Sequence, residues 1–364
     1  MKHSLIILTS LLIFFNSFQA LSFQNLDQVL ADPDVTWVGE IYVDYHTNIN
    51  ILEPENEETK NRHETIDYNA IEVLKIQQKV SEDHLSPIPS LFAEKIFQLH
   101  RKTLNIYEDA ALTEKLSYNT YQSIINQEVE EVKITIDPET YQQIVKVFKL
   151  KLGPKNIEQF RLKQILSYHA KTNKLKITPI AIAPLQSINK FGERLEVALF
   201  WMPIKQIFET IDLSKPSISW AKRFDKGIAL DSINIIKGTS DLPTIFIKMI
   251  AEYRAEPNTP NMYKVTGENK QLVALKPEYV QKFGVELDTI ISFDPETREE
   301  VIQVVSDPLL PSYFKKINLI QDWIWDDKIQ AMQIRNVAFS PILYREDYNG
   351  NYWYTPCYLI KIKE

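Results

Sequence analysis

The sequence predicts an α+β fold made of two tandem repeats of one unit, each an antiparallel β-sheet packed with helices. Two observations predict this class. Blocks of the first half of the chain recur in order in the second half. Each half also mixes alternating strands with helical stretches, without the regular β-α-β alternation of a parallel sheet. With 44% hydrophobic residues, the chain can bury a substantial core.

The repetition is anchored by the tetrapeptide Asp-Pro-Glu-Thr, which occupies residues 137–140 and again 294–297. The same offset, held without a gap, keeps an ordered series of further residues matched, and such a series indicates duplication. We therefore predict a first repeat over residues 32–205 and a second over residues 215–364. The matched pairs include Leu162 with Leu319, Gln164 with Gln321, Lys171 with Lys328, Ile177 with Ile334 and Pro184 with Pro341.

Each repeat is predicted to open with a strand and to continue into two helices. In the first repeat, Trp37–Tyr45 has the β-branched and aromatic content of a strand. A first helix is expected to start at Pro89, and a second at Asp137, which would cap it with Pro138 in the first turn. The expected buried face of that second helix consists of Ile144, Val145, Val147 and Phe148.

A β-hairpin and a closing strand complete each unit. Residues 160–168 alternate apolar and polar side chains, a turn is expected at Thr172-Asn173, and 175–182 would return. Residues 319–325 and 332–337 repeat this pattern in the second half. The closing strands are predicted at Val197–Met202 and Cys357–Ile362.

The N-terminus and the overall charge bear on compartment and partners. Residues 1–20 combine Lys2, an apolar run and a small residue at Ala20, which is the pattern of a signal peptide. No later stretch is apolar enough to be a transmembrane helix.

The formal net charge of -7 argues against a nucleic-acid partner. Cys357 is the single cysteine, so no disulfide can form within the chain.

No pattern in the sequence predicts catalysis, a cofactor or a metal site. All six histidines lie before the second repeat, so the two units cannot share a histidine-based site. The pair Asp326-Asp327 could in principle serve a metal, but it falls at the expected turn of the second hairpin, where aspartate is common. No phosphate loop, nucleophile elbow or calcium-loop spacing occurs. We therefore expect a protein that is not an enzyme.

The second repeat is rich in aromatic residues. Trp323 and Trp325 alternate on a strand and share one face, which is either core or an exposed platform. Core packing is favoured because the first repeat has Leu166 and Tyr168 at these positions. The platform reading is kept as the alternative function: a stand-alone periplasmic glycan- or peptide-binding module that uses Trp323 and Trp353.

Several of these blocks resemble the GldN/PorN family of gliding-motility and type IX secretion proteins. The resemblance is carried by Pro179–Pro184, by the closing Leu199–Pro203, and in the second repeat by Gln321–Lys328 and Val337–Pro341. It implies a periplasmic, non-catalytic subunit that assembles with a GldK/PorK-like lipoprotein and other secretion-ring subunits. An oligomeric ring at the inner face of the outer membrane is the expected setting.

From this resemblance and from the exposed strand edges of such units, we expect a structural, protein-binding role. Two segments are the candidate contacts with a partner. One is the hairpin strand of the second repeat, and the other is its terminal strand. The candidate residues are Trp323, Trp325, Tyr358, Leu359 and Ile360.

Overall fold

The structure is a computed structural model. The predicted signal segment, 1–20, lies outside the residues it describes. The described residues are 26–46, 90–99, 104–136, 138, 141–157, 159–190, 193–208, 215–256, 262–266, 271–282, 285–293, 296–297, 300–346, 352–356 and 358–362.

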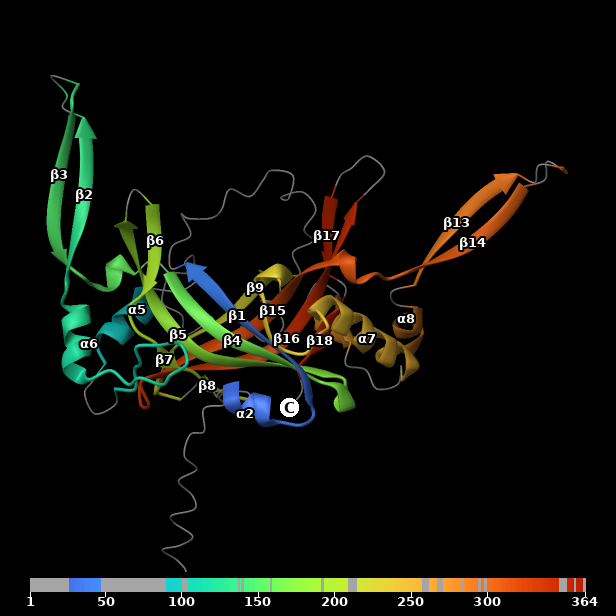
Figure 1. The fold of residues 1–364 in the computed structure, drawn as a ribbon, viewed down its shortest axis with the longest axis horizontal. Coiled ribbons are helices and arrows are strands. Elements are labelled where there is room, and N and C mark those ends of the chain that lie inside the picture. Colours follow the sequence, from blue (N-terminus) through green and yellow to red (C-terminus); the bar gives the residue numbers. More distant parts are fainter. Residues whose placement is uncertain are drawn as a thin grey trace, which may run out of the picture.

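Two antiparallel sheets form the body of the molecule (Figure 1). We use "first half" for the part of the chain up to β8 and "second half" for the part from residue 215 onward. The sheet built mainly from the first half is called sheet I, and the other is called sheet II. Sheet I contains, in spatial order, β10 (Asn234–Lys237), β1 (Val35–His46), β4 (Gln159–His169), β5 (Lys174–Lys190) and β6 (Glu193–Ala198), with β7 (Met202–Pro203) paired to β5. Sheet II contains β12 (Gln271–Ala274), β11 (Met262–Thr266), β18 (Leu359–Lys361), β16 (Ala331–Glu346), β15 (Phe314–Asp326) and β9 (Ile218–Ala229), with β17 (Tyr352–Pro356) and β8 (Lys205–Gln206) paired to β16.

Each half of the chain contributes one short strand to the sheet that is built mainly from the other half. Strand β10, from the second half, pairs with β1 of sheet I, where Glu40 lies opposite Asn234. Strand β8, from the first half, pairs in parallel with β16 of sheet II, where Gln206 lies opposite Ile334. The two halves are therefore interlocked through backbone hydrogen bonds as well as side chains.

Short helices lie against the sheets, and their bounds are α2 (Leu26–Ala31), α5 (Ser90–Phe97), α6 (Tyr118–Ile125), α7 (Leu242–Ala255) and α8 (Pro277–Lys282). The helix predicted near Pro89 is present as α5. Helix α7 starts as its sequence suggests, because the Asp241 side chain accepts a hydrogen bond from the Thr244 backbone N–H at 3.0 Å. Single 3-10 turns connect other elements: η3 (Pro154–Asn156), η4 (Ala170–Thr172), η5 (Leu230–Ser232) and η6 (Pro311–Tyr313).

One hydrophobic core lies between the two sheets and draws on both halves of the chain. Tyr45 of sheet I meets Trp323 of sheet II with ring centroids 4.5 Å apart. Phe92 of α5 stacks on Trp220 at 5.7 Å and touches Trp325 at 5.5 Å. These side chains are almost completely buried. Since so much apolar area is shared, the two predicted repeats do not have separate cores.

The hairpins at the centre of the two sheets share local detail. The bulge in the β4–β5 ladder falls between Lys163 and Gln164, and the bulge in the β15–β16 ladder falls between Ile320 and Gln321. The last residue of each connection, Asn173 or Gln330, has a left-handed backbone, with φ of 49° and 46°. The turn expected at Thr172-Asn173 is therefore present.

The prediction of a second helix, starting at the Asp-Pro-Glu-Thr motif, is wrong in both halves. Residues 128–151 form a two-stranded antiparallel ribbon, arm 1, and residues 285–308 form a second one, arm 2. The Asp-Pro-Glu-Thr motifs lie in the connections between the strands. β-branched residues dominate the strands, and this outweighs the capping signal. Arm 1 comprises β2 (Glu128–Ile136) and β3 (Gln143–Lys151), and arm 2 comprises β13 (Val285–Phe293) and β14 (Glu300–Pro308).

The closing strands are shorter than predicted. In the first half the segment expected at Val197–Met202 is broken, because β6 ends at Ala198 and β7 starts at Met202. Between them Trp201 exchanges two backbone hydrogen bonds with Tyr107, both at 2.8 Å. This pairing turns the chain away from β6, so a single strand cannot continue.

Candidate functional site

A polar cluster is buried at the centre of the sandwich. The Gln321 side-chain amide donates to Gln164 Oε1 and to Asn336 Oδ1, both at 2.7 Å. Asn336 Nδ2 in turn donates to the backbone carbonyl of Ile177 at 2.5 Å. The Tyr45 hydroxyl donates to Gln321 Oε1 at 3.5 Å. The cluster thus links both sheets with uncharged groups.

The chemistry of this cluster favours structure over catalysis. Burial raises the pKa of the Tyr45 phenol, so the hydroxyl stays protonated at neutral pH. The amides of Gln164, Gln321 and Asn336 do not titrate. A network of this kind can fix how the two sheets are aligned, because a shift would leave buried amides without partners.

The two tryptophans singled out in the sequence belong to the core. Trp323 is 0% exposed and Trp325 is 1% exposed. Trp325 Nε1 donates to Asp327 Oδ1 at 3.1 Å, and Trp323 packs on Phe224 with ring centroids 4.7 Å apart. The core interpretation is therefore correct for both residues. Burial of Trp323 counts against the glycan- or peptide-binding alternative, which needs an exposed aromatic face.

The terminal-strand residues singled out with them are also buried. Tyr358, Leu359 and Ile360 are all at most 5% exposed. Strand β18 lies between β11 and β16 in sheet II, with Ile360 opposite Met262 and Phe339. A role of these residues in binding a partner stays a prediction. In the folded chain their side chains are covered by this protein itself.

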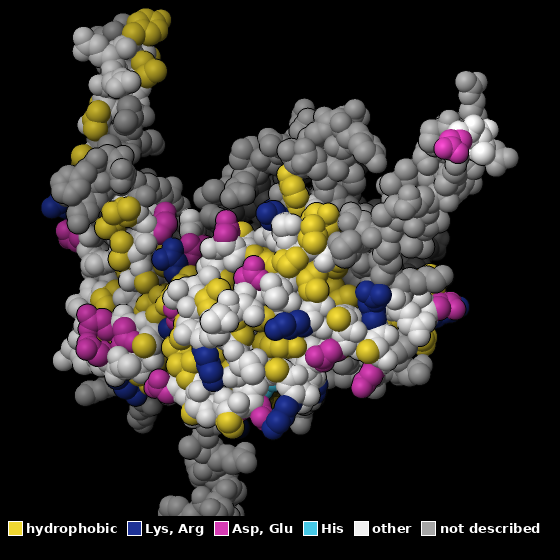
Figure 2. All heavy atoms as spheres, turned by 45° about the vertical axis from the view of Figure 1, so that its right-hand side comes forward, with side chains coloured by type: hydrophobic (Ala, Val, Ile, Leu, Met, Phe, Trp, Pro, Cys, Tyr) yellow, Lys and Arg dark blue, Asp and Glu magenta, His cyan; other side chains and the backbone are white. Residues whose placement is uncertain are grey.

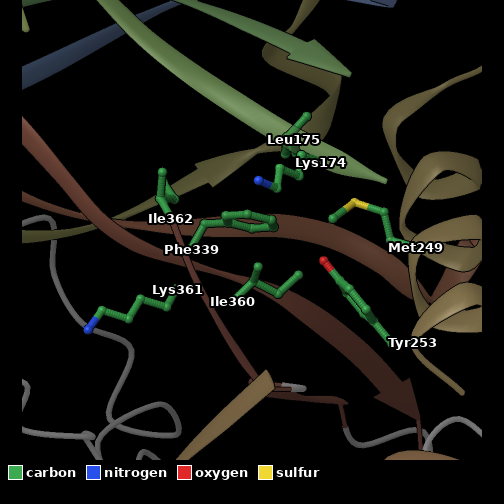
Figure 3. A pocket seen from close by; sticks show the side chains of 8 residues that line it. All are labelled: Lys174, Leu175, Met249, Tyr253, Phe339, Ile360, Lys361 and Ile362. Atoms are coloured by element: carbon green, nitrogen blue, oxygen red, sulfur yellow. The ribbon is translucent and has the colours of Figure 1, made fainter. Parts of the chain in front are cut away.

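Cavities in the described part of the chain offer little for chemistry. A cavity of about 30 Å³ lies beside α7, and its lining includes Met249, Tyr253, Phe339, Leu175 and Ile360. Figure 3 shows these side chains. The cavity volume is that of about one water molecule. A wider, open hollow of about 620 Å³ lies beside Trp37 and the start of α7. Its polar side chains are Asp231, Asp241, Lys315, Lys316 and Tyr344.

The acidic pair at the second hairpin turn has structural partners. Asp327 accepts from Lys95 of α5 at 3.0 Å, in addition to the Trp325 indole. Asp326 accepts from the Lys328 backbone N–H at 2.9 Å and from Gln333 Nε2 at 3.2 Å. The two carboxylates thus stabilise the turn and fasten α5 to it.

The described residues give no evidence for a metal site or for catalysis by histidine. Among them, no group of three or more His, Cys, Asp or Glu side chains could hold a metal ion. His169 is half-buried at the end of β4, and its burial lowers the pKa of the imidazole. His63, His84 and His100 lie outside the described residues.

The two arms, where a helix is predicted from the sequence, project from the body of the molecule. Figure 1 shows them projecting from opposite ends of the body. Arm 1 carries apolar side chains in solvent: Ile136 is 65% exposed, Tyr141 83%, Val145 57% and Val147 56%. Figure 2 shows apolar side chains along this arm at the upper left. Ile134 and Ile136 alternate with polar neighbours, and Ile144, Val145 and Val147 add β-branched side chains; these are the signals that indicate β-structure in this arm.

Comparison with known protein families identifies a related family. The family model described as "Gliding motility associated protein GldN" matches residues 88–223. This stretch runs from the start of α5 through arm 1 and most of sheet I to the first half of β9. No curated protein matches the chain. None of the described helices is long and apolar enough to cross a membrane.

Proposed function

We propose that this chain, which belongs to the GldN family through residues 88–223, is a non-catalytic subunit that binds other proteins within the periplasmic type IX secretion and gliding machinery. The family itself is associated with gliding motility. The observation that carries the binding role is the pair of β-ribbons projecting from the body, together with the exposed apolar side chains of arm 1.

The physical argument concerns what such ribbons need. An isolated two-stranded ribbon is marginally stable in water, and unpaired strand edges readily take up a further strand. In arm 1 the exposed Ile136, Val145 and Val147 gain nothing from staying in water. Contact with another protein would bury these side chains and pair the free edges, which suits a structural subunit.

The expected partners are a GldK/PorK-like lipoprotein and the other secretion-ring subunits, and the expected place is the inner face of the outer membrane. The Trp323, Trp325 and β18 positions could then act indirectly, by supporting the surface that the partner touches.

A photo-crosslinking experiment in cells tests this role. A photoreactive amino acid at Val147, on arm 1, should form crosslinks to envelope proteins, and mass spectrometry should identify a lipoprotein or ring subunit among them. The same amino acid at exposed Ile235 of β10 serves as control, since this strand belongs to the body and to neither arm. If Val147 crosslinks no protein other than this chain, or only the proteins that the control position also crosslinks, the proposed membership in the complex is wrong.

We also propose that the two halves arose by duplication of one unit. Support comes from the matched bulges, the matched left-handed residues and the two arms, each with nine-residue strands around the same tetrapeptide. Gln164 and Gln321 hold matched positions and bond directly to each other. Such a contact between equivalent residues is what a pseudo-twofold axis between the halves would produce.

A further inference from the structure

We propose that two copies of this chain associate head to tail through their arms, with the β3 edge of arm 1 in one copy pairing with arm 2 of the next copy. The occupant of the free β3 edge of arm 1 is thus a second copy of the same protein, and the exposed side-chain face of this arm stays open to other proteins. Association through the arms requires no envelope partner, so purified protein tests it independently of the role proposed above.

The first argument is the state of the strand edges. Each arm is a separate two-stranded sheet, and within the described residues neither arm pairs with a strand of the body. Both arms therefore present free backbone N–H and C=O groups along nine-residue strands. Joining one arm to the other would give a four-stranded sheet, which is far more stable than two isolated ribbons.

The second argument is charge. Strand β3 has Lys146, Lys149 and Lys151 and no acidic residue. The strands of arm 2 carry carboxylates and no lysine or arginine, and these residues are Glu286, Asp288, Glu300 and Asp307. Opposite charges on neighbouring strands stabilise a sheet, and like charges destabilise it.

Charge also selects the edge of arm 1. On β2, Glu128 and Glu130 lie opposite Lys151 and Lys149 of β3. Strand β2 carries three glutamates and one lysine, so pairing arm 2 with β2 would set mostly acid against acid. Pairing arm 2 with β3 instead places the lysines of β3 between two strands that are negative on balance. Pairing of two β3 edges would set lysine against lysine.

The third argument is position. The two arms of one molecule project from opposite ends of the body (Figure 1), so they cannot pair with each other. A contact between unlike surfaces leaves one free arm at each end of a pair of molecules. Such a heterologous contact can continue into a chain of copies or close into a ring.

The test is a charge exchange between the arms, measured by light scattering after size exclusion and by sedimentation velocity. The purified chain should show a mass that rises above 42.5 kDa with concentration. The association should be at least about tenfold weaker in about 500 mM than in about 50 mM NaCl, since salt screens exposed charges. Lys149→Glu with Lys151→Glu should leave monomers, and so should Glu286→Lys, Asp288→Lys, Glu300→Lys and Asp307→Lys combined.

Mixing the two variants is the decisive step, because arm 1 of each variant then meets an oppositely charged arm 2 of the other. Association should return only in the mixture. Lys248→Glu with Lys276→Glu, which makes the same charge change at exposed sites elsewhere, is the matched control and should associate like the parent chain. A melting curve checks that each variant folds, and the salt dependence of the unmodified chain tests the contact without any substitution.

Three results would overturn the proposal. The chain could stay monomeric at all concentrations in low salt. The arm 1 variant could associate as strongly as the control. Association could also depend on arm 1 and be unaffected by reversal of arm 2, which would indicate that copies join through arm 1 alone.

Discussion

At the scale of single residues, the close contact with Trp37 leaves no room for a side chain at Gly39. A Cβ on Gly39 would lie 2.6 Å from Trp37 Cη2 and 2.6 Å from Ile233 Cγ2. Both neighbours are held in place, since Trp37 is 2% exposed and Ile233 packs against the core. The Trp37 indole can approach the backbone of residue 39 this closely only because residue 39 has no side chain.

We predict that Gly39→Ala lowers the free energy of unfolding by about 1–3 kcal/mol, the usual effect of an overpacked core. Gly153→Ala is the matched control, because a Cβ there meets nothing closer than 3.7 Å. Its effect should be near zero or slightly stabilising. Thermal melting of both variants against the parent chain measures this. Equal melting temperatures for the two variants would show that the Trp37 contact is not restrictive.

Residue-level interpretation from sequence succeeded where a position is matched in both halves. Leu166 and Tyr168 in the first half indicated that Trp323 and Trp325 face the core, and both are buried. The same reasoning could not reveal the hydrogen bond between Gln164 and Gln321. An alignment of two segments says which residues are equivalent, but not that equivalent residues touch.

At the scale of elements, the loop after Tyr107 depends on one carboxylate. The Asp109 side chain accepts backbone hydrogen bonds from Ala111 at 2.7 Å and Glu114 at 2.8 Å, and one from the Thr113 hydroxyl at 2.9 Å. Partial burial alone would raise the pKa of Asp109, but the hydrogen bonds from Glu114, Thr113 and Ala111 outweigh it and lower the pKa below its ordinary value.

A carboxyl whose pKa is lower in the folded than in the unfolded chain stabilises the fold above its unfolded pKa. That contribution is lost as the pH falls through the folded pKa. Asp109→Asn should therefore lower the melting temperature at neutral pH, and the difference from the parent chain should shrink below about pH 4. Asp231→Asn, the same substitution at another exposed position, is the control. A difference that stays constant with pH would mean that the charge of Asp109 does not matter.

Elements were predictable where the hydrophobic alternation was unambiguous. The strand at Trp37 and the central hairpins with the Asn173 turn followed from a period of two. The arms were missed because Asp-Pro-Glu-Thr is equally suited to start a helix and to connect two strands. The β-branched residues around it, Ile134, Ile136, Val145 and Val147, were the stronger local signal.

At the scale of the whole molecule, the halves are interlocked in a way that local patterns could not reveal. The packing of α5 on Trp220 and the exchange of β8 and β10 between sheets join segments far apart in the chain. Periodicity shows which face of a strand is buried, but not which other element covers it. A two-domain division therefore looked natural in the sequence, although the core is common to both halves.

This shared core predicts that neither half folds alone. With a protease site inserted within residues 209–214, the cleaved but folded chain should run as one particle, because the sheets stay packed through Tyr45, Phe92, Trp323 and the glutamine pair. Each half expressed separately should lack a cooperative melting transition, since the aromatic side chains of the interface would face water. Co-expression of the halves should restore one transition near that of the intact chain, which serves as the control. A cooperative transition in either isolated half would contradict the common core and indicate two independent domains.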